Sequence, residues 1–385
     1  MTDLSQHVLS CLKEAIGDGP QPLHAPSFSG NELPYLTDCV ESTMVSSVGE
    51  YTQRFEQMLI GITGAQHVVA VVNGTAALQL ALLVAGVEPG DEVLVPALSF
   101  VATANAVAHC NAVPHFVDSN EHSLGMDPVA LRAWLVGCTH RKSGHTYNTV
   151  TGRRIRALVP MHTFGHPCDV ADLLAVADEF DLAVVEDAAE SLGSFSQGRH
   201  TGCFGLLGVL SFNGNKIVTT GGGGAILTDD PELARHARHL ATTAKSPHAW
   251  AFAHDEIGFN FRMPALNAAL GCGQLEQLPE FLASKRRLHA TYVQAFQGLD
   301  GVAILGEPEA CRSNYWLQTL ILDPEKSSER EQILKTTNDA GYSTRPAWEL
   351  LSDSLPYRDC PRAPLPVASS LVARIVNLPS SAGLA

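Results

Sequence analysis

Positive charge is scarce in this chain of 385 residues, in which 25 lysines and arginines face 40 aspartates and glutamates, for a net charge of −15 at pH 7. This balance argues against nucleic-acid binding or attachment to anionic membranes as the main function, because both need basic surface. A run of about 18 apolar residues, which a membrane span requires, is also absent. The first residues, "MTDLSQHVLSCLKEAIGDG", have neither the basic start nor the apolar core of a signal peptide.

Closely spaced cysteines are absent as well. The nine cysteines lie far apart, and no two of them form a C-x-x-C pair. This spacing excludes a zinc cluster of cysteines and a disulfide framework. It is typical of proteins in a reducing compartment, so we expect a cytoplasmic protein.

Two common nucleotide-binding motifs are missing. Lys216 is not followed by serine or threonine, so "NGNKIV" is not a phosphate-binding loop of the Walker type. A dinucleotide fingerprint fails too, because a count from Gly221 places Ile226 at the position of the last glycine. The four glycines at 221–224 therefore need another explanation.

A metal site is not predicted. The zinc-protease motif H-E-x-x-H does not occur, and no nearby carboxylate completes a ligand set in "HTFGHPC". We expect its three candidate ligands to be strand-end and loop residues near the rim of an active site (His162, His166 and Cys168).

From about residue 65 the sequence alternates apolar strand-like runs with helical segments. "HVVAVVNG", "DEVLVPALSF", "VPHFVD", "RALVPMHTFG", "LAVVEDAAE" and "GVLSF" are the strand-like runs. This alternation predicts an α/β fold with a mostly parallel sheet covered by helices on both faces. A helix is expected over 4–16, and a long helical stretch, bent near Pro279, over 264–296.

The organisation along the chain divides into three parts. We expect an N-terminal helix and active-site loop segment at 1–50, a large domain at 51–270, and a smaller α+β domain at 271–385. Ligands of parallel α/β sheets bind at the carboxyl ends of strands, so the residues that follow the strands of the large domain are the candidates for a site.

Several chemically distinct residues fall at such positions. Gly74 and Thr75 begin a helix, whose N–H groups could bind a phosphate or simply form a helix cap. Asp187 ends an apolar strand, where a carboxylate needs a cation or caps the next helix. Ser211 is a phosphate ligand or a loop hydroxyl, and Phe100 is an aromatic wall or a core residue.

With Lys216, these residues match the needs of pyridoxal 5′-phosphate (PLP). The phosphate of PLP needs helix N–H groups and hydroxyls, its ring nitrogen needs a carboxylate, and its aldehyde needs a lysine. The set therefore predicts PLP as the cofactor.

The sequence also resembles a known family. "NGTAAL", "PALSFVATANAV", "EDAAESLGS", "SFNGNKIVTTGGGG" and "GFNFRMPALNAALG" are similar to motifs of the DegT/DnrJ/EryC1/StrS sugar aminotransferases. This resemblance extends from "PLHAPSFSGNE" to "NLPSS". It implies fold type I of the PLP enzymes, with a mostly parallel seven-stranded sheet in the large domain. It also implies amination of keto groups on nucleotide-linked sugars.

The resemblance assigns roles to individual residues. It implies that Lys216 is the Schiff-base lysine, that Asp187 keeps the cofactor's ring nitrogen protonated, and that Glu190 lies near the cofactor. Gly74, Thr75 and Ser211 are implied phosphate ligands. In "GFNFRMP" the resemblance implies that Asn260 reaches the phosphate of a neighbouring subunit, so that a homodimer shares its active sites. Arg262 of the same motif is a substrate residue or a structural salt-bridge partner.

Two less diagnostic segments suggest a branch of the family. "SGNELPYLTDCVESTMVSSVGEYTQRFE" and "GYSTRPAWELL" resemble the legionaminic-acid type, which acts on UDP-4-keto-6-deoxy-N-acetylhexosamines. Met44 departs from that pattern, which has tryptophan there. Arg345, with Trp348 as a stacking surface, is our candidate for the substrate's diphosphate, and the alternative is a carboxylate-paired arginine beside a core tryptophan.

The predicted reaction is transfer of an amino group from L-glutamate to UDP-4-keto-6-deoxy-N-acetylglucosamine. Its product would serve surface polysaccharide or nonulosonic acid biosynthesis. Lys216, rather than the histidine of dehydratases in the family, favours amino transfer. The alternatives are a C3-specific aminotransferase, another PLP-dependent sugar enzyme, and a PLP-binding regulator without turnover.

Overall fold

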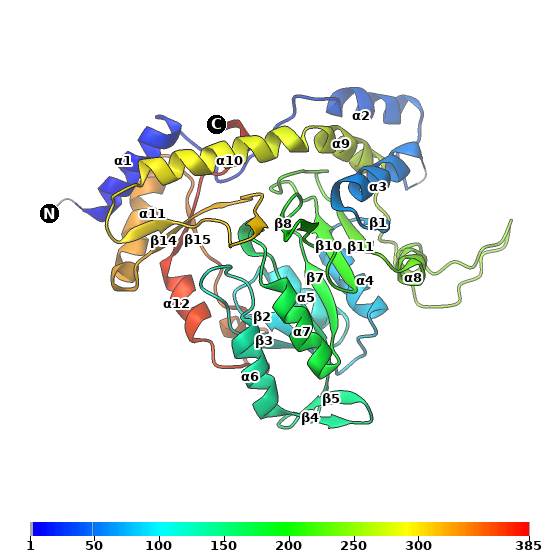
Figure 1. The fold of residues 1–385 in the computed structure, drawn as a ribbon. Coiled ribbons are helices and arrows are strands. Elements are labelled where there is room, and N and C mark those ends of the chain that lie inside the picture. The colour runs from blue at the N-terminus through cyan, green and yellow to red at the C-terminus, as the bar shows by residue number, and fades with distance from the viewer. Residues whose placement is uncertain (1–2, 48, 385) are drawn as a thin grey trace.

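A computed structural model describes residues 3–47 and 49–384 of the chain. Its largest sheet follows a seven-strand path and carries a two-stranded extension (Figure 1). In spatial order the path is β1 (His67–Val71), β11 (Gly224–Thr228), β10 (Leu207–Ser211), β7 (Ala183–Asp187), β6 (Arg154–Leu158), β2 (Glu92–Pro96) and β3 (Val113–Val117).

Strand direction confirms the mostly parallel sheet. β10, β7, β6, β2 and β3 pair in parallel, whereas β11 pairs antiparallel with both β10 and β1. β1 therefore runs in the same direction as β10. The carboxyl ends of β1, β10 and β7 therefore lie at one edge of the sheet. In the strand order β10 and β7 are neighbours, and β11 alone separates them from β1.

Alternating residues of the strands supply two separate apolar clusters. Val93 and Val95 of β2 belong to one cluster, and Leu94 between them belongs to the other. The helices α4 (Gly74–Val84), α5 (Val101–His109) and α8 (Pro231–Ala241) bury residues in the first cluster, and α6 (Pro128–Cys138) and α7 (Val170–Phe180) in the second. Both faces of the sheet are thus covered, as the near-continuous apolar strands require.

A second, four-stranded antiparallel sheet is built from the C-terminal part of the chain. Its order is β12 (Val302–Ile304), β14 (Gln318–Leu322), β16 (Ile375–Leu378) and β15 (Arg345–Pro346). The expected N-terminal helix, α1 (Leu4–Ile16), packs here: Val8 and Leu12 share an apolar cluster with α10 (Leu278–Ala295), α11 (Arg330–Asp339) and β16.

The long helical stretch is broken where proline predicts it. One residue, Gln277, separates the end of α9 (Ala265–Glu276) from the start of α10, and Pro279 lies in the first turn of α10. Proline is tolerated in a first turn because its missing N–H would have no helical partner there. α9 packs against α2 (Glu32–Glu41) and α3 (Glu50–Thr63) at the upper right of Figure 1.

Some elements were not predicted from the sequence. The hairpin of β4 (Thr139–Lys142) and β5 (His145–Asn148) joins the large sheet through β5, which pairs antiparallel with the start of β6. A small sheet joins β13 (Cys311–Arg312), β8 (Phe195–Ser196) and β9 (Arg199–His200). The remaining elements are α12 (Pro366–Arg374) and four short 3-10 helices (Thr163–Gly165, Pro324–Glu329, Leu351–Asp353, Ala382–Leu384). In the described part of the chain, no helix has both the length and the apolar character that crossing a membrane requires.

Candidate active site

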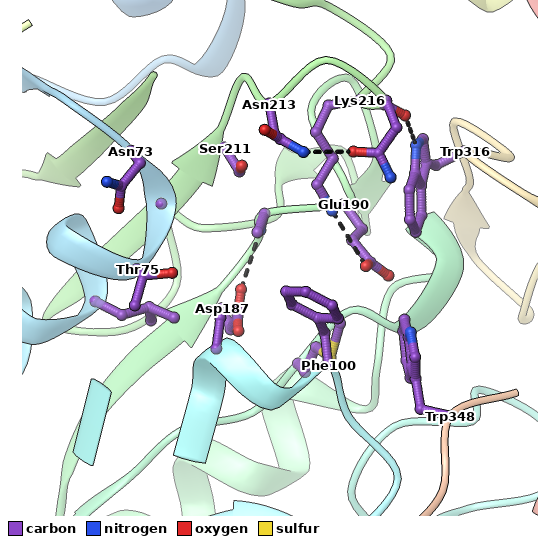
Figure 2. A pocket seen from close by; sticks show the side chains of 16 residues that line it. Asn73, Thr75, Phe100, Asp187, Glu190, Ser211, Asn213, Lys216, Trp316 and Trp348 are labelled. Atoms are coloured by element: carbon purple, nitrogen blue, oxygen red, sulfur yellow. Dashed lines mark hydrogen bonds and ion pairs between the residues drawn. The ribbon is translucent and has the colours of Figure 1, made fainter. Parts of the chain in front are cut away.

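A cavity of about 300 Å³ lies where the predicted residues meet, at the carboxyl edge of the large sheet. Figure 2 shows its lining side chains pointing toward a shared space. Of the residues predicted from the sequence, eight line it: Gly74, Thr75, Phe100, Asp187, Glu190, Ser211, Lys216 and Trp348.

The first turn of α4 forms one end of this cavity. Asn73 is the N-cap, and its Oδ1 accepts a hydrogen bond from the N–H of Ala76, 2.8 Å away. The cap therefore leaves the N–H groups of Gly74 and Thr75 without intrahelical partners. Within the described chain, the hydroxyls of Thr75 and Ser211 also have no recorded hydrogen bond, and both residues line the cavity. These donors, with the positive end of the helix dipole, suit a phosphate.

Close backbone approach explains two glycines here. A Cβ on Gly74 would lie 2.9 Å from the Cβ of Ser211, and a Cβ on Gly224 would lie 2.5 Å from the backbone of Asn73. Gly221 has φ +75°, which disfavours any side chain. The glycine run thus lets the chain after Lys216 turn back against the start of α4.

Asp187 ends β7 beneath the cavity and is 2 % exposed. Its Oδ2 accepts a hydrogen bond from the hydroxyl of Thr103 at 2.7 Å, and its Oδ1 accepts one from the N–H of Ala189 at 3.2 Å. Burial raises the pKa of Asp187, although these hydrogen bonds and the charge of Lys216 oppose the rise. The carboxylate would be stabilised by a cationic partner, which a protonated ring nitrogen supplies.

Lys216 and Glu190 form an ion pair at the other end. Nζ of Lys216 lies 3.2 Å from Oε1 of Glu190, and the N–H of Phe164 donates to Oε2 at 2.9 Å. Burial raises the pKa of Glu190 to about 7, against the opposing charge of Lys216. The lysine amine is held inside the cavity beside a carboxyl that titrates near neutral pH.

This raised pKa makes stability depend on pH. The folded chain holds the Glu190 proton up to about pH 7, whereas a glutamate in the unfolded chain has a pKa of 4.5. The contribution of Glu190 to stability is therefore full below pH 4.5 and is lost as pH rises through 7. We expect the wild type to lose free energy of unfolding relative to Glu190→Gln between these limits. Denaturant unfolding of both cofactor-free chains across pH 4.5 to 8 measures this, and a constant difference would contradict it.

Aromatic side chains form the remaining wall. Phe100 is 47 % exposed and faces the cavity, so it is not a core residue. Its ring centroid lies 6.1 Å from that of Trp348, which packs in turn on Phe164 at 4.9 Å. Trp316 places its ring 4.1 Å from Nζ of Lys216.

Sequence reasoning missed several lining residues. Asn213 and Asn215 flank Gly214 between β10 and Lys216, where their position in the lysine loop was a usable signal. Trp316 gave no such signal, because it lies just before β14 in "NYWLQTLIL" and resembled part of a strand. Met161 was likewise not singled out.

Three predicted residues lie outside this cavity. Asn260 and Arg262 are exposed, and Oδ1 of Asn260 accepts from Nε and Nη2 of Arg262 at 3.1 and 3.0 Å. Arg345 is exposed and donates to Oδ1 of Asn338 at 2.9 Å. It lines a neighbouring cavity of about 550 Å³ that shares Asn215, Trp316 and Trp348 with the first. No carboxylate partner is recorded for either arginine among the described residues.

The segment "HTFGHPC" follows β6 as predicted, and its Phe164 lines the adjoining cavity, but the three candidate ligands do not reach the rim. His162, His166 and Cys168 are fully or almost fully buried and do not line the cavity. Nδ1 of His162 accepts from the N–H of Cys168, and its Nε2 pairs with Glu186 at 3.1 Å. Glu186 also accepts backbone N–H groups of the 202–205 turn, so the histidine belongs to a buried structural network.

These donors and acceptors fit PLP. The start of α4 and two hydroxyls would hold the phosphate, Asp187 the ring nitrogen, and Lys216 the aldehyde carbon. Bound there, the cofactor supplies an electron sink for the carbon that loses its proton.

Comparison with known proteins agrees with this site. Residues 26–385 match the model of the DegT/DnrJ/EryC1/StrS aminotransferase family. The chain is 35 % identical over 366 residues to GDP-perosamine synthase of Caulobacter vibrioides, covering 94 % of this chain and 93 % of that protein. It is 34 % identical to GDP-perosamine synthase of Escherichia coli O157:H7, covering 93 % of each.

A solved structure supports the same relationship. The aminotransferase TlmJ from Streptoalloteichus hindustanus superposes with a TM-score of 0.86 at 29 % identity, over 95 % of each chain. The expected fold type I is thereby confirmed. The chain belongs to the DegT/DnrJ/EryC1/StrS family and is a PLP-dependent sugar aminotransferase.

Proposed function

We propose that the enzyme transfers an amino group from L-glutamate to the C4 ketone of a nucleotide-linked 4-keto-6-deoxy sugar. The observation that carries the proposal is the position of Nζ of Lys216, buried in a cavity between an anion-binding helix start, a carboxylate and aromatic walls. Lys216 binds the cofactor at rest. Once released, its amine moves the proton of the carbon that bears the amino group.

Turnover distinguishes this proposal from the alternative of a PLP-binding regulator. Addition of L-glutamate to the PLP-loaded enzyme should convert the absorbance of the lysine-bound cofactor into that of its aminated form. A regulator without turnover would leave the spectrum unchanged. Nuclear magnetic resonance of the isolated product separates amination at C4 from amination at C3.

The identity of the sugar has two candidates. Sequence resemblance to the legionaminic-acid type favours UDP-4-keto-6-deoxy-N-acetylglucosamine. The names of the two perosamine synthases favour a GDP-linked sugar instead. Arg345 and Trp348, which line the adjoining cavity, are our candidates for binding the diphosphate and the base, and they suit either nucleotide.

The two sugars give a direct prediction. If UDP-4-keto-6-deoxy-N-acetylglucosamine is the substrate, its kcat/KM should exceed that of a TDP-linked 4-keto sugar without the acetamido group by about 100-fold or more. Polar groups placed to bind the amide would lose their partners in the TDP-linked sugar. A GDP-linked 4-keto-6-deoxy sugar is the competing arm. Mass spectrometry of each reaction identifies the preferred acceptor, and equal kcat/KM for the UDP- and TDP-linked sugars would refute the branch while leaving the aminotransferase intact.

We also propose a homodimer with shared active sites. Asn260 and Arg262 lie outside their own chain's cavity and are exposed, which supports a role in the site of a second copy. The segment after α8 projects at the right of Figure 1. Large apolar side chains are exposed in this segment, namely Trp250, Phe252 and Ile257. An obligate dimer would bury such a surface.

Mixing inactive variants tests this arrangement. Lys216→Ala chains should be inactive alone and Asn260→Ala chains weakly active. After mixing and refolding they should regain up to about a quarter of wild-type activity, because hybrid dimers contain one intact site. A fully active monomer in light scattering would rule the shared site out. Mixtures of Lys216→Ala with Asp187→Ala serve as the control, since both changes damage the same chain's site and restore nothing.

We also propose that the chain divides into an N-terminal segment at 1–50, a large PLP-binding domain at 51–270 and a smaller C-terminal domain at 271–385. We also propose a cytoplasmic location, which the nine free cysteines support.

A further inference from the structure

The amine of Lys216 has two neighbours from different parts of the chain. Glu190 comes from the segment after β7, and Trp316 from the segment before β14 (Figure 2). A ring centroid 4.1 Å from an amine is within cation–π distance. Nε1–H of Trp316 also donates to the carbonyl of Asn215 at 2.7 Å, so Trp316 contacts both the amine and the backbone that carries it.

The amide of Asn314 joins the two neighbours. Its Oδ1 accepts from the N–H of Trp316 at 2.8 Å, and its Nδ2 donates to the carbonyls of Glu190 and Leu192 at 2.9 and 3.0 Å. The side chain is fully buried. Because both Nδ2 hydrogens and Oδ1 are used, Asn314 fixes the spacing between the segments of Glu190 and Trp316.

Backbone conformation around Asn314 is adapted to this arrangement. Gly165 has φ +95°, and a Cβ there would lie 1.9 Å from Oδ1 of Asn314. Phe164 has φ +55°, which is rare for a bulky residue, and it aims its N–H at Oε2 of Glu190. Unfavourable backbone conformations of this kind cluster at active sites, where the surrounding structure maintains them.

We infer that Asn314 and Trp316 position the amine of Lys216 during proton transfer, an inference that rests on the proposed role of Lys216. Trp316 contacts the amine, and Asn314 acts through Trp316 and Glu190. A released lysine side chain has many rotamers, and the two contacts confine Nζ to one region of the cavity. Such confinement matters because a displacement of about 1 Å can cost about 100-fold in rate.

Single-turnover kinetics of the PLP-loaded enzyme with saturating L-glutamate tests the inference. We expect Trp316→Leu and Asn314→Asp each to lower this rate constant about 10- to 100-fold. The KM for L-glutamate, measured separately in the steady state, should change less than about threefold. Asn314→Asp keeps an acceptor for Trp316 but replaces the two donors. The rate constant of the double variant should lie within about twofold of that of the slower single variant, because the effects of residues that act as a unit are not additive.

Three further measurements separate positioning from a purely structural role. Trp316→Phe keeps a ring over the amine and should retain most of the rate, and it carries the test if Asn314→Asp does not fold. Ser313 lies in the same segment, but its hydroxyl donates a hydrogen bond to the carbonyl of Gly165. The rate constant of Ser313→Ala should therefore stay within about twofold of wild type. With 5-fluorotryptophan, the fluorine resonance of Trp316 should move in Lys216→Met, whereas those of Trp134 and Trp250 should not.

Additive losses, an unchanged rate in Trp316→Leu or an unmoved Trp316 resonance would each overturn the inference. Borohydride reduction of every variant keeps this outcome distinct from failure of the proposed function. If the cofactor is still fixed to Lys216 while the rates are normal, only the positioning role is lost. If the cofactor is fixed elsewhere, the role of Lys216 itself is wrong.

Discussion

Lys216→Ala should abolish amino transfer while leaving PLP able to bind. The variant loses the amine that we propose attaches the cofactor and moves the proton, yet it retains the start of α4, the hydroxyls of Thr75 and Ser211, and Asp187. A rate loss of about 10⁴-fold or more is expected, because nucleophile and general base are removed together. Stopped assays with the accepted keto sugar measure the loss, and equilibrium dialysis measures the retained cofactor.

Borohydride labelling provides the positive counterpart of this experiment. Reduction of the wild-type PLP complex should fix the cofactor to the peptide that contains Lys216, and mass spectrometry identifies that peptide. Lys285 is a matched control: it is also buried, but its Nζ donates to the backbone carbonyls of Tyr315, Trp316 and Ser380. A label on Lys285 or any other lysine would contradict the assignment.

Asp187→Ala should weaken PLP binding and slow turnover by about 10²-fold or more. Without a carboxylate partner the ring nitrogen loses the charge that makes the cofactor an electron sink. The effect is expected in kcat as well as in cofactor affinity, because the charge is needed when the substrate carbon loses its proton. Steady-state kinetics at saturating PLP separates the two, and near-wild-type turnover would show that Asp187 serves only as a cap.

A second strand-end aspartate offers a control for that alternative. Asp118 follows β3 and accepts hydrogen bonds from the N–H groups of Val367 and Ala368 in the first turn of α12. Asp118→Ala should lower the free energy of unfolding by about 1 kcal/mol, as loss of a helix cap does. Its turnover per folded molecule should not change, whereas that of Asp187→Ala should.

The residues that could be predicted from sequence share a simple physical origin. β7 and β10 correspond to short apolar runs in the sequence, and each run ends in a polar residue. The positions of Asp187 and Ser211 at strand ends could therefore be predicted from the apolar pattern. The start of α4 was located by the change from a strand-like to a helical pattern after Asn73. Because parallel strands end at one edge, the convergence of these residues followed from the topology.

Residues outside this logic were missed for identifiable reasons. Trp316 lies on an irregular segment fixed by the side chain of Asn314, and no periodicity describes such a segment. The β4–β5 hairpin is polar and gives no apolar pattern, although its turn residues Ser143 and Gly144, both at positive φ, carry a recognisable hairpin signal. The burial of His162 depends on Glu186, a pairing of two distant segments.

The packing of α1 has a consequence for synthesis of the chain. α1 is translated well before its apolar partners on α10, α11 and β16, which come more than 250 residues later in the chain. β16 is also an inner strand of the C-terminal sheet, between β14 and β15. While the large sheet forms on the ribosome, the apolar face of α1 therefore has no partner of its own. We expect nascent chains that stop before β16 to expose α1 to protease and chaperones, and chains that include β16 to protect it.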